Sequence, residues 1–269
     1  MLISLITPAY NSARTISDTL LSVNGQTYPA IEHIIVDGLS TDGTLEVVEE
    51  IGDRREAGRT PGEGMVAAAT CPVCRKVICG KDKGLYDAMN KGIREATGEV
   101  VGILNSDDFF TSPDVLEEVA KAFEEDETLD AVYGDIHFVR PEDLTKCVRY
   151  YSSRVFRCWL MRLGFMPAHP SFYVRRSCYQ RLGLYKTDYR ICADFELLLR
   201  YLFVHRIRAR YLPMDFVTMR TGGISTSGLS AFRQIMKEHL RAFRENHIYT
   251  NRLILSLRYA YKVLEFVRR

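Results

Sequence analysis

The feature that most constrains the fold is a short apolar run, residues 100–104, that ends directly in Asn105-Ser106-Asp107-Asp108. β-Branched residues preceded by glycine, here Gly98, predict a buried strand. Ligand sites in α/β sheets open at the carboxyl ends of the strands, where the two carboxylates fall. Adjacent carboxylates repel each other, so a hard divalent cation that itself holds a phosphate fits this pair. An acidic turn that only ends the strand is the alternative interpretation.

The composition narrows the class of protein. A chain of 269 residues can bury a large core, and 36 Lys and Arg against 34 Asp and Glu argue against a dedicated nucleic-acid binder. The sequence shows no signal-peptide pattern and no run of about 20 apolar residues. Its seven cysteines, an odd number, predict reduced thiols. We therefore expect a cytoplasmic protein, with peripheral attachment to the inner face of the cell membrane left open.

Two strand-loop-helix units are predicted in the first fifty residues. Residues 2–7 and 31–36 are apolar runs, and each precedes a turn-forming segment and apolar residues at helical spacing. Neither unit has a Gly-x-Gly-x-x-Gly or P-loop motif. Phosphate contacts must then come from elsewhere, and the acidic pair is the candidate.

Residues 52–81 break this pattern, and we predict a loop or insertion that ends in a strand at 77–79. Cys71-Pro72-Val73-Cys74 has the spacing of half a zinc site, but no second pair follows at matching spacing. A solvated loop is therefore favoured over zinc. Further helices are predicted after Asp82 and over 113–125, with strands at 130–133, 136–139, 147–151 and 172–174.

Two residues of the second half are candidates for chemistry. Asp194 begins a helix whose apolar face holds Phe195, Leu198 and Leu199, so its carboxylate suits a helix cap as well as a catalytic role. His169 precedes a strand, and a lone histidine is more often a satisfied core residue than a ligand.

The C-terminal part is expected to be an extension of the main domain. Residues 221–228 are rich in glycine and hydroxyl groups, which suits a mobile flap. Two amphipathic helices should follow, and residues 229–269 carry nine Lys and Arg against three Asp and Glu. A basic amphipathic helix can lie on an anionic membrane, and a solvated helix packed on the domain is the equal alternative.

Several motifs, taken in order, resemble the family 2 glycosyltransferases of the GT-A fold. They are Thr7-Pro8-Ala9-Tyr10-Asn11, residues 36–44, residues 105–108 and residues 193–200, while residues 82–92 are similar to the branch that builds bacterial exopolysaccharide, colanic acid or lipopolysaccharide. The resemblance implies an α/β fold of the nucleotide-diphospho-sugar transferase type, with a Rossmann-like mixed sheet flanked by helices over residues 1–220. Residues 221–269 would form the flap and the basic C-terminal helices.

The resemblance also implies roles for individual residues. The nucleotide sugar would contact Pro8, Ala9, Tyr10, Asp37, Asp82, Lys83 and Asp107. Asp107 and Asp108 would hold Mg²⁺ or Mn²⁺ on the diphosphate, Asp194 would be the catalytic base, and His169 would contact the acceptor or phosphate. Two positions depart from the family pattern, since Asn105 stands where Asp is commoner and Ala193 where Glu or Asp is usual.

The function implied is metal-dependent transfer of a sugar from a nucleotide-diphosphate sugar to a lipid-linked or oligosaccharide acceptor in cell-surface polysaccharide biosynthesis. One base and no second nucleophilic carboxylate favour inversion at the anomeric carbon. A sugar nucleotidyltransferase is the alternative, although the sequence lacks an early glycine-rich triphosphate loop. An inactive GT-A-like binding protein is a further alternative, against which the intact Asp107, Asp108 and Asp194 argue.

Overall fold

The computed structural model describes residues 1–57, 73–222 and 228–257. Its strands are β1 (Ile3–Ala9), β2 (Ile31–Asp37), β3 (Cys74–Cys79), β4 (Val100–Ile103), β5 (Phe109–Phe110), β6 (Ala131–Arg140), β7 (Asp143–Tyr151), β8 (Phe172–Arg175) and β9 (Ala209–Arg220). The helices are α1 (Ile16–Asn24), α2 (Thr44–Ala57), α3 (Leu85–Glu95), α4 (Val115–Glu125), α5 (Arg176–Leu182), α6 (Ala193–Leu198) and α7 (Gly228–Glu245). Shorter helical turns are η1 (Cys158–Leu163), η2 (His169–Ser171) and η3 (Leu199–Val204).

The strands of the described residues form one mixed sheet in the order β3-β2-β1-β4-β8-β6-β9-β5, and β7 pairs with the outer half of β6. The first four strands of this order are parallel, so β1, β2, β3 and β4 all end at the same edge. Strand β8 runs antiparallel to both β4 and β6. The loops that follow β1, β2 and β4 therefore meet at one edge of the sheet.

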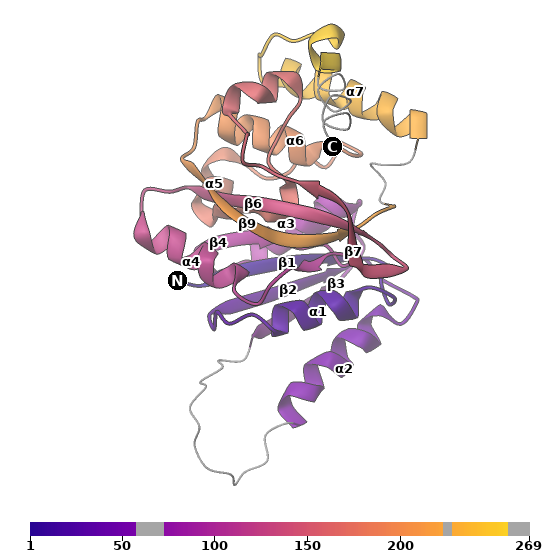
Figure 1. Ribbon diagram of the computed structural model, residues 1–269. Helices are drawn as coiled ribbons and strands as arrows, with labels where there is room; N and C mark the ends of the chain where they lie inside the picture. The colour runs from indigo at the N-terminus through magenta and orange to yellow at the C-terminus, as the bar shows by residue number, and fades with distance from the viewer. Residues whose placement is uncertain (58–72, 223–227, 258–269) are drawn as a thin grey trace.

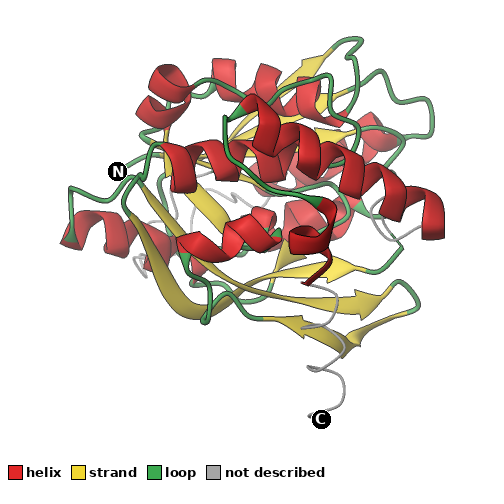
Figure 2. Ribbon diagram, turned by 90° about the horizontal axis from the view of Figure 1, so that it is seen from above, coloured by secondary structure: helices red, strands yellow, loops and turns green. Residues whose placement is uncertain are grey.

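Helices cover both faces of the sheet (Figures 1 and 2). Side chains alternate across a strand, so Leu5 of β1 packs in the core under α4, while its neighbour Ile6 packs under α3. Helix α3 lies close on β1 because Gly92 has no side chain, and a Cβ there would lie 2.4 Å from Cγ2 of Ile6. This close packing places the N-terminus of α3 at the strand-end loops.

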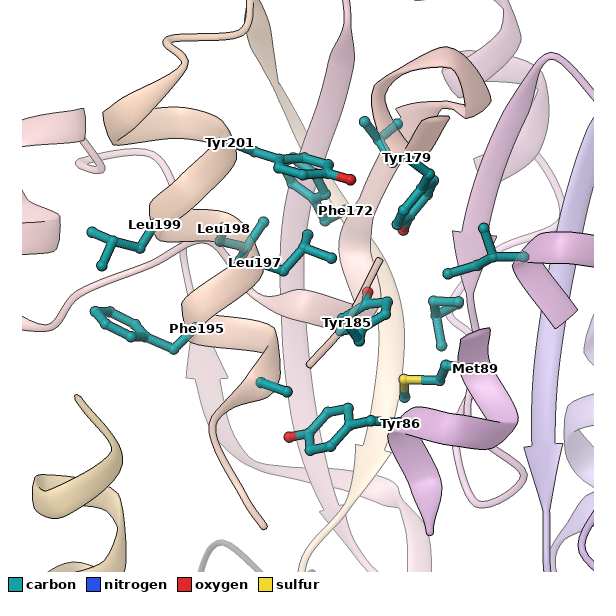
Figure 3. Packing of buried hydrophobic residues seen from close by; sticks show 14 of the residues in the cluster. Tyr86, Met89, Phe172, Tyr179, Tyr185, Phe195, Leu197, Leu198, Leu199 and Tyr201 are labelled. Carbon is teal, nitrogen blue, oxygen red and sulfur yellow. The ribbon is translucent and has the colours of Figure 1, made fainter. Parts of the chain in front are cut away.

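An aromatic core joins α3 to α6. Tyr185 lies between Tyr179 and Tyr86 (Figure 3), and its ring stacks on that of Tyr86 with 5.9 Å between centroids. The Tyr86 hydroxyl donates a hydrogen bond to the carbonyl of Ile191, just before α6. The entrance of α6 is therefore held against α3.

Several elements differ from the sequence expectations. Helix α2 continues to Ala57 and β3 occupies 74–79, so only residues 58–72 of the expected loop at 52–81 lie outside the described residues. Residues 130–133 and 136–139 belong to one strand, β6, whose register against β9 shifts near Gly134, where a Cβ would meet the Phe216 ring at 2.5 Å. The prediction of two separate strands was wrong, because in the sequence the residues at this irregularity separate two apolar runs in the way that the end of a strand does.

The C-terminal elements are described in part. Helix α7 was predicted, but Phe232, expected on its inner face, is 41% exposed, because the helix is turned to bury Ala231 and Glu238. The expected flap falls largely on residues 223–227, and the last predicted helix falls partly on residues 258–269; these parts, like Cys71, lie outside the described residues. Within 1–57, 73–222 and 228–257, no helix has the length and apolar character needed to cross a membrane.

Candidate functional site

The loops after β1 and β2 are bonded to each other. The backbone N–H of Asn11 donates to Oγ of Ser40 at 2.8 Å, and Oδ1 of Asn11 accepts from the N–H of Thr41 at 2.9 Å. Asn11 adopts a left-handed backbone with φ of 50°, which asparagine tolerates better than most residues. These hydrogen bonds give the edge of the sheet a preorganised rim.

Asp37 closes the rim from the end of β2, where it pairs in register with Ala9. Its side chain is fully buried, and its carboxylate accepts from the N–H and the hydroxyl of Ser40 at 2.9 and 2.5 Å. Pro8 and Ala9 lie within β1 and are buried as well. The Asp37 carboxylate is thus held by hydrogen bonds from Ser40, a residue of the loop that directly follows it.

Gly38 brings two further predicted residues together. A Cβ at this position would lie 2.6 Å from Oδ2 of Asp82 and 3.3 Å from the ring of Tyr10. The Tyr10 ring is 65% exposed. Asp82 is held by a bond from the Gly84 N–H to its Oδ1 at 2.9 Å, and the next residue, Lys83, is exposed. The Asp82 carboxylate and the accessible Tyr10 ring therefore approach the Gly38 backbone more closely than any residue with a side chain would allow.

The acidic pair follows β4 at the same edge. Asp108 is 1% exposed, whereas Asp107 reaches the surface. Oδ2 of Asp108 accepts from the Asn105 amide at 2.9 Å. Oδ1 of Asp108 and Oδ1 of Asn105 are buried and have no hydrogen-bond partner among the described residues. Two buried oxygen atoms without partners at one turn call for a positively charged or hydrogen-bonding ligand.

Electrostatics supports the same interpretation. Burial, followed by the charge of Asp107, raises the pKa of Asp108 well above its ordinary value, while the Asn105 hydrogen bond and Arg220 oppose the rise. Loss of water also raises the pKa of Asp107, against the attraction of Arg220. Ionising both carboxylates is therefore unfavourable without an added cation.

The donor set fits Mg²⁺ or Mn²⁺ that is shared with phosphate oxygens. Such ions are commonly held by one or two carboxylates, with phosphates and waters completing the coordination. Over the described parts of the chain, no cluster of three or more His, Cys, Asp or Glu side chains forms a complete protein-only metal centre. The turn can supply the Asp107 and Asp108 carboxylates and the free oxygen of Asn105.

Arg220, at the end of β9, connects the acidic turn to α1. Its guanidinium donates to the backbone carbonyl of Asp107 and pairs with the carboxylate of Asp18. The same group lies 5.2 Å from the centre of the Phe109 ring. Arg220 thus holds the turn in place and puts a positive charge beside it.

Asp194 lies on a different element, as the second residue of α6. Its Oδ1 accepts from the N–H of Phe195 at 2.7 Å. Burial, followed by repulsion from Glu238, raises the pKa of the Asp194 carboxyl to about 6. The charge of Asp194 also raises the pKa of both Tyr86 and Tyr185, which places these two phenols near it. Asp194 has the raised pKa typical of a general base.

Glu238 of α7 holds the chain that enters α6. Its buried carboxylate accepts from the consecutive N–H groups of Arg190, Ile191 and Cys192 at 2.8, 2.9 and 2.8 Å. Gln234 adds a fourth hydrogen bond, at 2.6 Å. These hydrogen bonds lower the pKa of Glu238 against the opposing effect of burial. Glu238 therefore sets the position of the helix that carries Asp194.

His169 is buried in η2, where Nε2 lies 2.8 Å from the hydroxyl of Tyr185. Burial lowers the pKa of His169 to about 4, so the ring is neutral at physiological pH. The histidine is thus a paired core residue that connects to the tyrosine near Asp194.

Comparison with known proteins identifies the family. The sequence profile described as Glycosyl transferase family 2 matches residues 4–183. The chain belongs to this family. The family 2 resemblance seen in the motifs is therefore confirmed, and the protein is a glycosyltransferase of that type.

Relatives of this family member include a "PGL/p-HBAD biosynthesis glycosyltransferase" of Mycobacterium bovis, 29% identical over 83% of this chain and 79% of that protein. A "putative teichuronic acid biosynthesis glycosyltransferase" of Bacillus subtilis is 36% identical over 40% of this chain and 36% of its own.

Solved structures confirm the GT-A fold. TarS 1-349 of S. aureus in complex with UDP-GlcNAc has a TM-score of 0.65 at 18% identity, over 90% of this chain and 66% of that one. The mannosyltransferase PcManGT of Pyrobaculum calidifontis, in complex with GDP-Man and Mn²⁺, has a TM-score of 0.61 at 21% identity, over 91% of this chain and 67% of that one. The family 2 chain thus spans about two thirds of the TarS fragment.

The structure adds two site residues that the sequence analysis missed. Glu238 lies on the apolar side of α7, four residues before the buried Ala242 and seven after the buried Ala231. A carboxylate at such a position indicates a side chain that is buried and accepts hydrogen bonds within the protein. Arg220 offers no comparable local signal, because its partners Asp107 and Asp18 are 113 and 202 residues away.

Proposed function

We propose that the protein is an inverting glycosyltransferase that moves a sugar from a nucleotide-diphosphate sugar to a hydroxyl of a lipid-linked or oligosaccharide acceptor. The observation that carries the proposal is the separation of two acidic centres. A buried turn with unpartnered oxygens follows β4, while a single carboxyl of raised pKa begins α6. A reaction that must neutralise a diphosphate and deprotonate a hydroxyl needs both.

The donor would lie on the rim formed by the loops after β1 and β2. The exposed Tyr10 ring can pack on a nucleobase, with the Asp82 carboxylate close to it at Gly38 and Asp37 at the end of β2. Pro8 and Ala9 would support this rim, and the exposed Lys83 would meet the negative charge of the donor. UDP-GlcNAc in TarS and GDP-Man in PcManGT support a nucleotide-sugar donor here.

Asp107 and Asp108 would hold Mg²⁺ or Mn²⁺. When bound, this ion would supply Lewis-acid neutralisation of the leaving diphosphate. Asp107 would also contact the ribose, and Arg220 would hold the turn in position through its hydrogen bond to the Asp107 carbonyl. The Mn²⁺ bound in PcManGT supports the assignment.

Asp194 would act as the base. Its carboxylate takes the proton of the acceptor hydroxyl while that oxygen bonds to the anomeric carbon and the carbon–diphosphate bond breaks. With a pKa of about 6 the group is ionised at neutral pH and still basic enough to accept the proton. His169 would act on the acceptor or phosphate side by holding Tyr185. A single displacement of this kind inverts the anomeric centre.

The acceptor would belong to cell-surface polysaccharide biosynthesis. Relatives named for PGL/p-HBAD and teichuronic acid biosynthesis support this class. Peripheral contact of the C-terminal segment with the membrane is part of the proposal. Its described residues support it, because Tyr249, Leu253 and Leu257 recur at four-residue spacing and are 74%, 80% and 57% exposed.

A panel of UDP-, GDP- and dTDP-sugars with Mn²⁺ tests the proposal. We expect at least one donor to protect the protein against thermal unfolding and to be hydrolysed slowly. The Asp107→Ala/Asp108→Ala double variant should lose the Mn²⁺-dependent part of this protection, whereas Asp194→Asn should keep it and lose turnover. Absence of binding across the panel, with unchanged metal affinity in the double variant, would contradict the proposal.

A further inference from the structure

The segment that contains η1 exposes apolar side chains although it is well anchored. Phe156 and Met161 are 8% and 0% exposed, and the Phe156 ring packs edge-on against Tyr133 with 5.9 Å between centroids. Val155, which directly precedes Phe156, is 62% exposed, and Trp159, which lies between Phe156 and Met161 in the sequence, is 61% exposed. Trp159 is the only tryptophan of the chain. The outward position of these two side chains thus belongs to an ordered surface.

The exposed apolar surface continues onto a neighbouring element. Turn η1 packs against η3, whose last residue, Val204, is 41% exposed. Arg206 follows η3, and its charge acts on Cys158 of η1. We call the surface formed by Val155, Trp159, Val204 and the adjacent arginines the Trp159 face.

The Trp159 face lies in a strongly basic stretch of the chain. Residues 144–187 contain no Asp or Glu. The Lys and Arg residues of this stretch are Lys146, Arg149, Arg154, Arg157, Arg162, Arg175, Arg176, Arg181 and Lys186. Because the whole chain carries a formal charge of only +2, this local excess is a property of one region.

Three of these arginines are available to a partner. Arg154, Arg157 and Arg162 are exposed and form no ion pair with any described residue. Nη1 of Arg157 donates only to the backbone carbonyls of Arg154 and Phe156, at 3.4 and 2.8 Å. Their charge is therefore not neutralised on the described surface.

We propose that the Trp159 face docks on an anionic lipid bilayer, with Trp159 at the level of the headgroups and the arginines on lipid phosphates. Tryptophan is enriched at membrane interfaces because its ring is apolar and its indole N–H is polar. Cations near an anionic leaflet add electrostatic attraction. An exposed apolar centre surrounded by cations, with no carboxylate in the stretch, matches both requirements. The inference extends the proposed use of lipid-linked acceptors, but its test does not depend on turnover.

The single tryptophan makes the test direct. The full chain is mixed with phosphatidylcholine vesicles that contain or lack phosphatidylglycerol, and its tryptophan fluorescence is recorded. We expect a blue shift with the anionic vesicles only, reversed by high salt, and quenching when the acyl chains are brominated. Fluorescence that stays unchanged with anionic vesicles would overturn the proposal, as would an equal shift with heparin or RNA, which would indicate a general polyanion site.

Variants then locate the surface. Arg157→Glu/Arg162→Glu keeps the fluorophore, and we expect its affinity for anionic vesicles to fall more than tenfold, since each lost charge weakens binding about fivefold. Because Trp159→Ala lacks the fluorophore, its binding to the vesicles is measured by flotation. Leu21→Ala, which removes another exposed apolar side chain on α1, is the matched control and should float as the parent does.

Donor hydrolysis without lipid and the circular dichroism spectrum should stay unchanged in all three variants. Flotation of the arginine variant at the level of the parent would refute the location. If the parent chain does not hydrolyse any donor, that result counts against the proposed function, whereas the lipid measurement remains valid.

Discussion

Gly38 shows how one residue without a side chain shapes the donor rim. In Gly38→Ala the new Cβ would lie 2.6 Å from Oδ2 of Asp82, the free end of a side chain, so Asp82 must move away. We expect KM for the nucleotide sugar to rise about tenfold with kcat nearly unchanged, since ground-state and transition-state contacts are lost together. Gly80→Ala, which meets nothing within 4 Å, is the control in the same steady-state kinetics. Equal effects of both variants would contradict this role.

Asp194 should impose a pH dependence on turnover. Because burial raises its pKa to about 6, the carboxyl is protonated below this pH and cannot accept a proton. We expect kcat to fall tenfold per pH unit well below pH 6 and to be level above it. A pH profile of kcat at saturating donor measures this. An acid limb that lies near pH 4 would show that Asp194 does not control the step.

The same residue should cost stability in the active pH range. A carboxyl with a raised folded-state pKa adds no penalty below its unfolded pKa near 4, and the full penalty is present above pH 6. Two pKa units correspond to about 3 kcal/mol as an upper bound. We expect Asp194→Asn to raise the free energy of unfolding by about 2 kcal/mol at pH 8 and by nearly nothing at pH 4. Urea unfolding at both pH values checks this, and a pH-independent gain would refute it.

At the scale of elements, α7 positions α6 through Glu238. In Glu238→Gln the amide nitrogen faces backbone N–H groups, so at least one of the three donors at 190–192 loses its acceptor, at a cost of about 2 kcal/mol. We expect kcat to fall more than tenfold with little change in donor KM. The acid limb of the pH profile should also move to lower pH, because Glu238 no longer raises the pKa of Asp194.

Charged and polar groups around Asp194 and Glu238 come from several elements, and none but Glu238 changes in this variant. They include Tyr86 of α3, Tyr185, Cys192 and Gln234, together with His239 of α7, whose ring stacks on that of Phe195. Glu245→Gln is the matched control, since this residue of the same helix contacts Lys186, Tyr189 and Arg241. A pH limb that does not move in Glu238→Gln would reduce Glu238 to a structural role.

At the scale of the whole molecule, two surfaces are proposed to meet the membrane, and they can be separated. A chain that ends at Leu257 retains Leu255, which is buried in the core, and loses residues 258–269 with their four Lys and Arg and one Glu. We expect this chain to bind anionic vesicles several-fold more weakly in flotation and to keep the blue shift of Trp159 fluorescence. Full binding by the shortened chain would show that the C-terminal segment is not an anchor.

The sequence alone determined what depends on neighbouring residues. Apolar periodicity predicted most strands and helices, and turn chemistry placed Asp37, Asp107 and Asp108 at strand ends, because side-chain alternation and turn preferences act over a few residues. The motifs predicted the family for the same reason, since each spans fewer than a dozen positions.

Only the tertiary structure decided how these parts act on one another. The carboxylate of Glu238 reaches Cys192 across 46 residues, and Arg220 reaches Asp107 across 113. His169 is paired with Tyr185, and the unpartnered oxygens of Asp108 and Asn105 exist because burial removes the water that would satisfy them. Such contacts and pKa shifts arise from packing between distant segments, which local sequence preferences do not encode.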